Sequence, residues 1–217
     1  MAHDVAAFLA RRSLRSGVHL VGHSMGAKMA MALALDHRLN LALRSLTVVD
    51  MAPTTEPIEP QYADYARGMM EIEASKVATM READAILQKY ESTAATRQFL
   101  LTNAVNVRDP SGVDPPHLRF RCALPILAEG IATLGDFPHE TSDVDPLAAP
   151  SVCWAGPTLF LRGGKSDYLT PRNIPAAQHF FPRSKISTIP RAGHWVHADA
   201  PEETTKSISN FVRDALG

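Results

Sequence analysis

The sequence predicts an α/β fold built on a parallel sheet, and three observations support this prediction. Short apolar runs typical of buried strands occur at 18–21, 46–49 and 158–161. Helix-forming residues separate the first two runs, which gives the order strand, helix, strand of a βαβ unit with parallel strands. Strand periodicity is then absent over most of 57–157, and the alternation resumes after it. The fold is therefore a parallel sheet interrupted by a long insertion.

The first segment predicts a helix, a strand, a second helix and a second strand. Apolar residues at helical spacing within 1–15 indicate an amphipathic helix, which Gly17 ends. The strand 18–21 follows, and 25–35 is rich in the strong helix formers Ala, Leu and Met. Asp50 and Pro53 stop the second strand.

The sequence of the insertion predicts mainly helices. Apolar patterning favours helices at 62–73, 76–90, 94–105 and 125–134, with Pro- and Gly-containing loops between them. We interpret the insertion as a helical lid, so the predicted division of the chain is 1–56, 57–157 and 158–217. The last segment predicts a strand, a helix near 174–180, a strand at 185–189 and a helix that begins at Pro201.

Composition excludes several classes of protein. Hydrophobic residues make up 45% of the chain and charged residues 21%, as in ordinary globular proteins. A formal net charge of −1 disfavours nucleic acid or an anionic membrane as a partner. Two cysteines, Cys122 and Cys153, cannot form a disulfide framework: they allow one bridge at most, and they favour a reducing compartment. We expect no membrane span, and no targeting segment is recognisable in this chain.

Residues 22–26 read GHSMG, which matches G-x-S-x-G between a predicted strand and a predicted helix. In that context the motif is a nucleophile elbow, and the next N–H, that of Met25, serves the oxyanion hole. Because the turn is tight, we expect a side chain at Gly22 or Gly26 to collide with its neighbours. We also expect Ser24 to have a strained backbone. The motif predicts Ser24 as a nucleophile.

A serine nucleophile needs a base, and the base needs an acid to orient it. His194 follows the last predicted strand and is the candidate base, whereas His23 and His197 are predicted to pack. Two residues are candidate acids: Asp50 follows the second strand and Asp167 follows the third. Both stand at carboxyl ends of strands, where open α/β sheets bind ligands. Spacing alone does not separate them.

Taken together, these motifs resemble the α/β-hydrolase family over almost the whole chain, with 48–53, 97–103 and 160–164 as further matching segments. RQFLLTN and AGHWVHAD look most like the branch that contains the mitochondrial abhydrolase domain-containing protein 11, bacterial esterases and yeast ethanol acetyltransferases. The resemblance implies cleavage of a small acyl ester or thioester, with acyl transfer to an alcohol in some members. It implies Asp50 as the acid, with Asp167 as the alternative. It also implies a mitochondrial location, with the cytoplasm as the alternative, and neither a metal nor another cofactor.

The chain departs from the family before the elbow. Family members have further strands there, and an upstream loop that supplies the second oxyanion N–H. We therefore expect the chain to be N-terminally truncated relative to the family, and one missing donor would correspond to about 10²–10³ in rate. The edge of strand 18–21 would also be bare. We expect marginal stability, self-association through this edge, or an incomplete gene sequence, and a catalytically impaired remnant stays an alternative.

Overall fold

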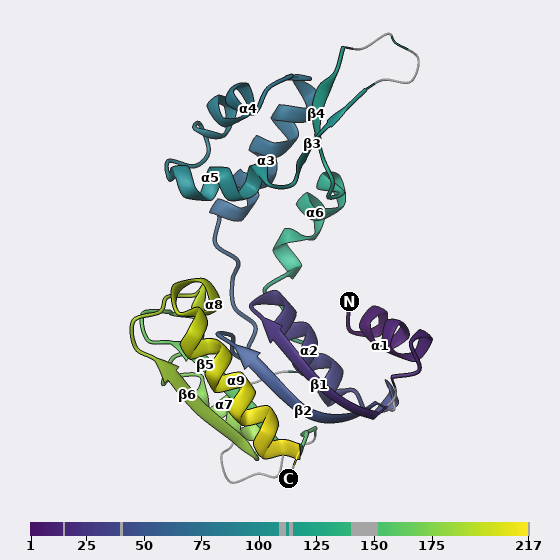
Figure 1. Ribbon diagram of the computed structural model, residues 1–217, viewed down its shortest axis with the longest axis vertical. Coiled ribbons are helices and arrows are strands. Elements are labelled where there is room, and N and C mark those ends of the chain that lie inside the picture. The colour runs from purple at the N-terminus through teal and green to yellow at the C-terminus, as the bar shows by residue number, and fades with distance from the viewer. Residues whose placement is uncertain (15, 40, 109–111, 113–114, 140–151, 217) are drawn as a thin grey trace. The chain divides into compact units, whose positions relative to one another are not determined.

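The computed structural model describes residues 1–217 except 15, 40, 109–111, 113–114, 140–151 and 217 (Figure 1). The chain divides into two compact units. Unit 1 comprises Met1–Thr55 and Asp136–Gly217, and unit 2 comprises Glu56–Gly135. Arg15 of the first predicted helix and 140–151 of the predicted lid lie outside the described residues.

Unit 1 contains a four-stranded parallel sheet in the order β1-β2-β5-β6. Its strands are β1 (Ser16–His23), β2 (Ala42–Val49), β5 (Thr158–Gly163) and β6 (Ser184–Ile189). The predicted parallel sheet is confirmed, and each strand extends beyond its apolar run. Because parallel strands end at the same edge, the loops after all four strands meet there.

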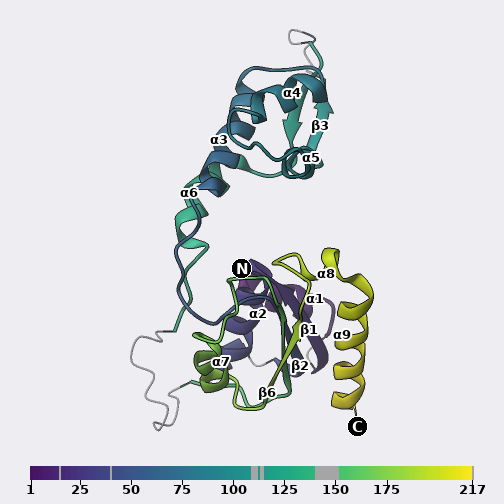
Figure 2. The same cartoon turned by 90° about the vertical axis from the view of Figure 1, so that its left-hand side faces the viewer.

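Helices cover both faces of this sheet, as Figure 2 shows. On one face α2 (Met25–Leu35) and α7 (Ile174–Phe180) bury a core that includes Met31, Leu46 and Phe160. On the other face α9 (Pro201–Leu216) and the short α8 (Val196–Asp199) pack over Leu161 and Ile189. The remaining elements are α1 (Ala2–Arg11), which contacts α2, and the 3₁₀ turn η1 (His37–Leu39).

Unit 2 is a small helical body with one hairpin. Its helices are α3 (Gln61–Ala74), α4 (Met80–Leu87), α5 (Ala94–Leu101) and α6 (Leu124–Gly130), followed by η2 (Ile131–Thr133). Strands β3 (Ala104–Val107) and β4 (His117–Phe120) pair antiparallel. The unit has its own core, which includes Ile72, Leu87 and Leu118, all fully buried.

The sequence interpretation of unit 2 was wrong at several helix boundaries and missed the hairpin. The predicted helix 94–105 ends at Leu101, because the chain turns at Thr102 and the β-branched Val105 and Val107 follow. The predicted helix 76–90 begins at Met80, because Thr79 and Glu82 form a capping box. In β4, buried Leu118 and Phe120 flank an exposed residue, a strand alternation too short to detect in the sequence.

Two further features of the described residues bear on the chain's environment. None of the described helices is long and apolar enough to cross a membrane. Cys122 and Cys153 are both free thiols.

Candidate active site

The strand β1 passes into α2 through a strained turn at Ser24. Ser24 has φ 55° and ψ −125°, a conformation that non-glycine residues adopt at a cost of about 1–3 kcal/mol. Its N–H donates a hydrogen bond of 3.2 Å to the Val49 carbonyl, which holds the turn against the end of β2. The turn therefore projects the serine at the carboxyl edge of the sheet.

The two glycines of the motif differ in their surroundings. A Cβ at Gly22 would lie 2.7 Å from the Cα of Ala27 and would also meet the Gly26 carbonyl. A Cβ at Gly26 meets no atom within 4 Å, so the expected collision at this position was wrong. The chain folds back onto Gly22, whereas a side chain at Gly26 would meet open space.

The structure brings Ser24, His194 and Asp50 into one hydrogen-bonded series. His194 Nε2 lies 2.9 Å from Ser24 Oγ, and His194 Nδ1 lies 2.8 Å from Asp50 Oδ2. Because a carboxylate accepts hydrogen bonds, Nδ1 carries the ring proton and Nε2 accepts from the serine hydroxyl. The series has the geometry required for proton transfer from the hydroxyl to the imidazole.

The carboxylate of Asp50 is fully buried and has several donors. Oδ1 accepts the Gly163 N–H at 2.9 Å, and Oδ2 accepts the hydroxyl of Ser166 as well as the His194 ring. Asp50 itself has φ 51°, a backbone conformation that is uncommon for residues other than glycine. The other candidate acid, Asp167, is exposed, and no contact described in the structure joins it to His194.

Close backbone packing holds the loop that carries His194. A Cβ at Gly163 would lie 2.8 Å from the Ala192 carbonyl, so the end of β5 can touch this loop because it lacks a side chain. On the other side, the Gly193 N–H donates to Asp199 Oδ2 at 2.7 Å. The imidazole therefore extends from a backbone that is fixed on both sides.

Sequence reasoning missed several neighbours of the imidazole. Tyr168 stacks on His194 with ring centroids 3.9 Å apart and an interplanar angle of 26°. His23, predicted to pack, also donates from Nε2 to the His194 carbonyl at 2.9 Å. Ser166 and Tyr168 flank Asp167, so proximity to a candidate acid was the one signal that the sequence offered for them.

The N–H of Met25 lies at the first helical position of α2. N–H groups in the first turn have no acceptor within their helix, and the helix dipole places partial positive charge there. This end of α2 is suited to an oxyanion that forms beside Ser24. Among the described residues, no group of three or more His, Cys, Asp and Glu side chains could hold a metal ion.

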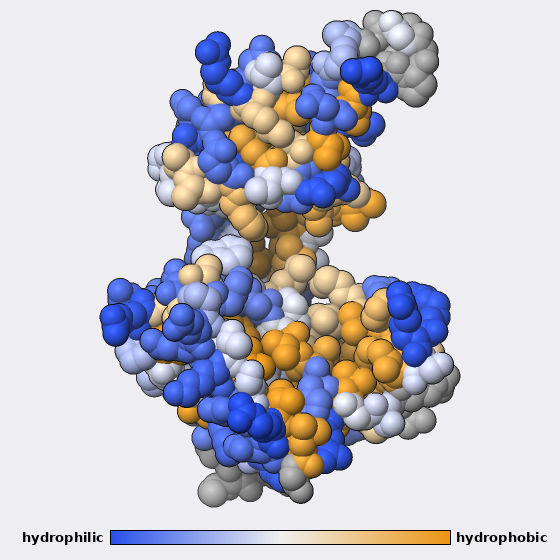
Figure 3. Space-filling model, in the orientation of Figure 1, coloured by the Kyte–Doolittle hydropathy of each residue, from blue (hydrophilic) through white to orange (hydrophobic). Residues whose placement is uncertain are grey.

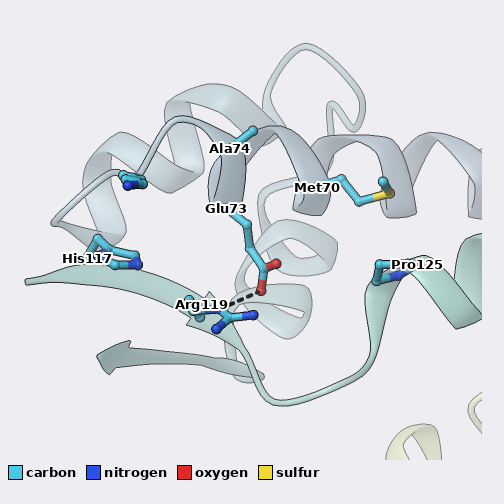
Figure 4. Close-up of a pocket in the computed structure, with 7 residues that line it drawn as sticks. Met70, Glu73, Ala74, His117, Arg119 and Pro125 are labelled. Atoms are coloured by element: carbon cyan, nitrogen blue, oxygen red, sulfur yellow. Dashed lines mark ion pairs between the residues drawn. The ribbon is translucent and has the colours of Figure 1, made fainter. Parts of the chain in front are cut away.

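Unit 2 has a hollow of about 440 Å³ of its own, between the end of α3, β4 and the start of α6 (Figure 4). Glu73 points across it to Arg119, with a closest N–O distance of 3.9 Å, and also accepts the Phe120 N–H at 2.8 Å. The Glu73 carboxylate thus joins α3 to β4. None of the candidate site residues lines this hollow, which is bordered by Met70, Glu73, Ala74, Lys76, His117, Arg119 and Pro125.

Several known proteins are similar to this chain in sequence. The chain is 33% identical to the mouse (Mus musculus) protein named sn-1-specific diacylglycerol lipase ABHD11, over 98% of this chain and 64% of that protein. It is 32% identical to a Saccharomyces cerevisiae protein named probable alcohol acetyltransferase, over 98% of this chain and 62% of that protein. The chain therefore spans about two thirds of the length of these relatives.

A solved structure and a family model extend the comparison. The structure of a marine microorganism esterase superposes with a TM-score of 0.79 and 28% identity, and the match covers 97% of this chain and 75% of that one. The model of the alpha/beta hydrolase family matches residues 2–206. The family predicted from the motifs is confirmed: the chain belongs to the alpha/beta hydrolase family.

Proposed function

We propose that this protein is a serine hydrolase that cleaves a carboxylic ester or thioester through an acyl-enzyme on Ser24. The observation that carries the proposal is the hydrogen-bonded series Ser24–His194–Asp50, with distances of 2.9 and 2.8 Å. The strained backbone at Ser24 supports the same role, because strain at such a residue is typical of functional sites. In this proposal Asp50, rather than Asp167, is the acid.

The first half-reaction acylates the serine. Ser24 Oγ attacks the carbonyl carbon of the substrate while His194 Nε2 takes the hydroxyl proton. Asp50 stabilises the imidazolium, and the Met25 N–H donates to the oxyanion of the tetrahedral intermediate. When the intermediate collapses, the carbon–oxygen or carbon–sulfur bond breaks and the leaving alkoxide or thiolate takes the proton from His194.

The second half-reaction releases the acyl group. Water replaces the alcohol or thiol, gives a proton to His194 Nε2 and attacks the ester carbonyl on Ser24. Collapse of the second intermediate returns that proton to Ser24 Oγ and liberates a carboxylic acid. A small acyl ester or thioester is the substrate class that we propose, supported by the esterase and lipase names of the similar proteins.

A second candidate function is acyl transfer to an alcohol, favoured by the similarity to the probable alcohol acetyltransferase. The same series of residues serves both reactions, because an alcohol can attack the acyl-enzyme in place of water. A third reading is a catalytically impaired remnant that retains the site. We also propose that the chain self-associates through the edge of β1. On the basis of the resemblance we propose a mitochondrial location, which cell fractionation tests.

Covalent labelling with a fluorophosphonate tests the proposal. We expect one label on the wild-type chain, loss of the label in Ser24→Ala, and full labelling of Ser209→Ala, a matched control exposed on α9. A folded wild-type chain that is not labelled contradicts the serine hydrolase. Turnover of an acetyl thioester, with and without a high concentration of alcohol, separates the other readings: ester product indicates acyl transfer, and a labelled chain without turnover indicates the remnant.

A further inference from the structure

His23 stands immediately before Ser24 and reaches the backbone of the candidate base. Its Nε2 lies 2.9 Å from the carbonyl oxygen of His194, a contact that joins the end of β1 to a loop distant in the sequence. A carbonyl oxygen accepts hydrogen bonds and cannot donate them, so His23 Nε2 carries a proton. The direction of this hydrogen bond is therefore fixed by chemistry.

Three other rings surround the His23 imidazole. Its centroid lies 4.8 Å from that of His194, 5.5 Å from that of Trp195 and 4.8 Å from that of His197. Burial lowers the pKa of His23 from its usual value, and this outweighs the hydrogen bond to the His194 carbonyl, which raises it. A lowered pKa favours the neutral ring, which adds no positive charge beside an imidazolium forming on His194.

We propose that His23 is a positioning residue, and that its hydrogen bond to the His194 carbonyl sets the separation of Ser24 Oγ and His194 Nε2. The proposal rests on the proposed function, since it concerns the same proton transfer. Asp50 holds the imidazole ring through Nδ1, and Asp199 holds the loop through the Gly193 N–H, but neither contact joins His194 to the end of β1 that carries Ser24. His23 links the two reacting residues, because its side chain binds the His194 carbonyl and its backbone is bonded to that of Ser24.

The expected effect follows from geometry. A misplacement of about 1 Å between reacting groups costs on the order of 10²-fold in rate. Loss of the His23 hydrogen bond leaves the contacts of Gly193 and Asp50 in place, so we expect a reduction of about 10–100-fold in kcat. KM should stay within about twofold, because His23 acts through His194 rather than on the substrate.

Three variants of His23 separate positioning from structural support. His23→Phe keeps a ring without the donor, whereas His23→Gln places an amide N–H at a reach similar to Nε2. His23→Asn keeps the polarity but is too short to reach the carbonyl. We expect Phe and Asn to slow both kcat and fluorophosphonate labelling of Ser24, and Gln to restore them to within a few fold.

His19→Phe is the matched control. His19 lies on the same strand and its Nδ1 is 2.7 Å from Ser45 Oγ, so the variant also removes a ring hydrogen bond, but away from Ser24. We expect its kcat to equal that of the wild type. Thermal unfolding of every variant shows whether activity merely follows stability.

The outcomes are distinguishable. Wild-type kcat and labelling rates in both His23→Phe and His23→Asn overturn the positioning role. Equal losses of kcat in His23→Asn and His23→Gln also overturn it, as does a loss of kcat that parallels the fall in Tm. If His23→Phe does not fold, the difference in kcat between His23→Asn and His23→Gln still tests the positioning role. A wild-type chain that fluorophosphonate does not label refutes the proposed function itself, whereas normal labelling of the variants refutes the positioning role alone.

Discussion

Two non-glycine residues with positive φ, Ser24 and Asp50, carry the centre of the candidate site. Each follows directly after a parallel strand, and each is held by a backbone hydrogen bond from its N–H to the strand beside it. The acceptors are the Val49 and Leu161 carbonyls, at 3.2 and 2.9 Å. The sheet thus stabilises two strained conformations that a flexible loop would not retain.

Asparagine substitutions distinguish the two candidate acids. Asp50→Asn removes the charge that faces His194 Nδ1 and permits the wrong ring tautomer, so we expect kcat to fall about 10³–10⁴-fold. Asp167→Asn alters an exposed side chain and should leave kcat unchanged. Ester hydrolysis at neutral pH measures both, and the reverse order of effects would make Asp167 the acid.

The sequence allowed some of these residues to be predicted because they belong to local patterns. Ser24 lies in a motif between a strand and a helix, and His194 follows a strand directly. Ser166 and Tyr168 belong to no such pattern, because their contacts with Asp50 and His194 join segments far apart in the chain. The hydrogen bond of His23 could not be predicted either, since it depends on where the backbone at residue 194 lies.

Among the structural elements, the strands of unit 1 were predicted better than the helices and hairpin of unit 2. Buried parallel strands form continuous apolar runs, whereas β3 and β4 are four residues each and each has one exposed side chain. The start of α4 is set by the capping box at Thr79, which is recognised from its hydrogen bonds rather than from the apolar periodicity of the sequence. Local patterns therefore define where the core elements lie, and hydrogen bonds define where they end.

The junction of β1 and α2 gives a test at the scale of elements. Gly22→Ala would place a methyl group 2.7 Å from the Cα of Ala27, so we expect the free energy of unfolding to fall by about 1–3 kcal/mol or more. Gly26→Ala meets open space within α2, where alanine favours the helix by up to about 1 kcal/mol. Urea denaturation of both variants checks this, and equal losses of stability would contradict it.

For the whole molecule, each unit has a hydrophobic core of its own. The core of unit 1 lies on both faces of the sheet, and that of unit 2 lies between its helices and the hairpin. Hydrophobic residues also gather on the surface of unit 1 over β1 (Figure 3), where Val21 is 47% exposed. This exposed strand is where an interaction with a second chain would begin.

The two ends of the described sheet differ in how they resist such pairing. β6 carries Lys185 with an exposed side chain, and lysine on an edge strand opposes pairing with another chain. β1 reads SGVHLVGH, without lysine or arginine, and β2 is its one neighbour in the described sheet. We therefore expect chains to associate through β1.

Light scattering over a range of protein concentrations tests this expectation. The wild-type chain should form dimers or larger species as the concentration rises, and Val21→Lys should shift it to the monomer, because the new charge cannot be buried between paired strands. Thr188→Lys places the same charge on an exposed site of β6 and should leave the association unchanged. A wild-type chain that is monomeric throughout, or an equal effect of the two lysines, would show that β1 is not the interface.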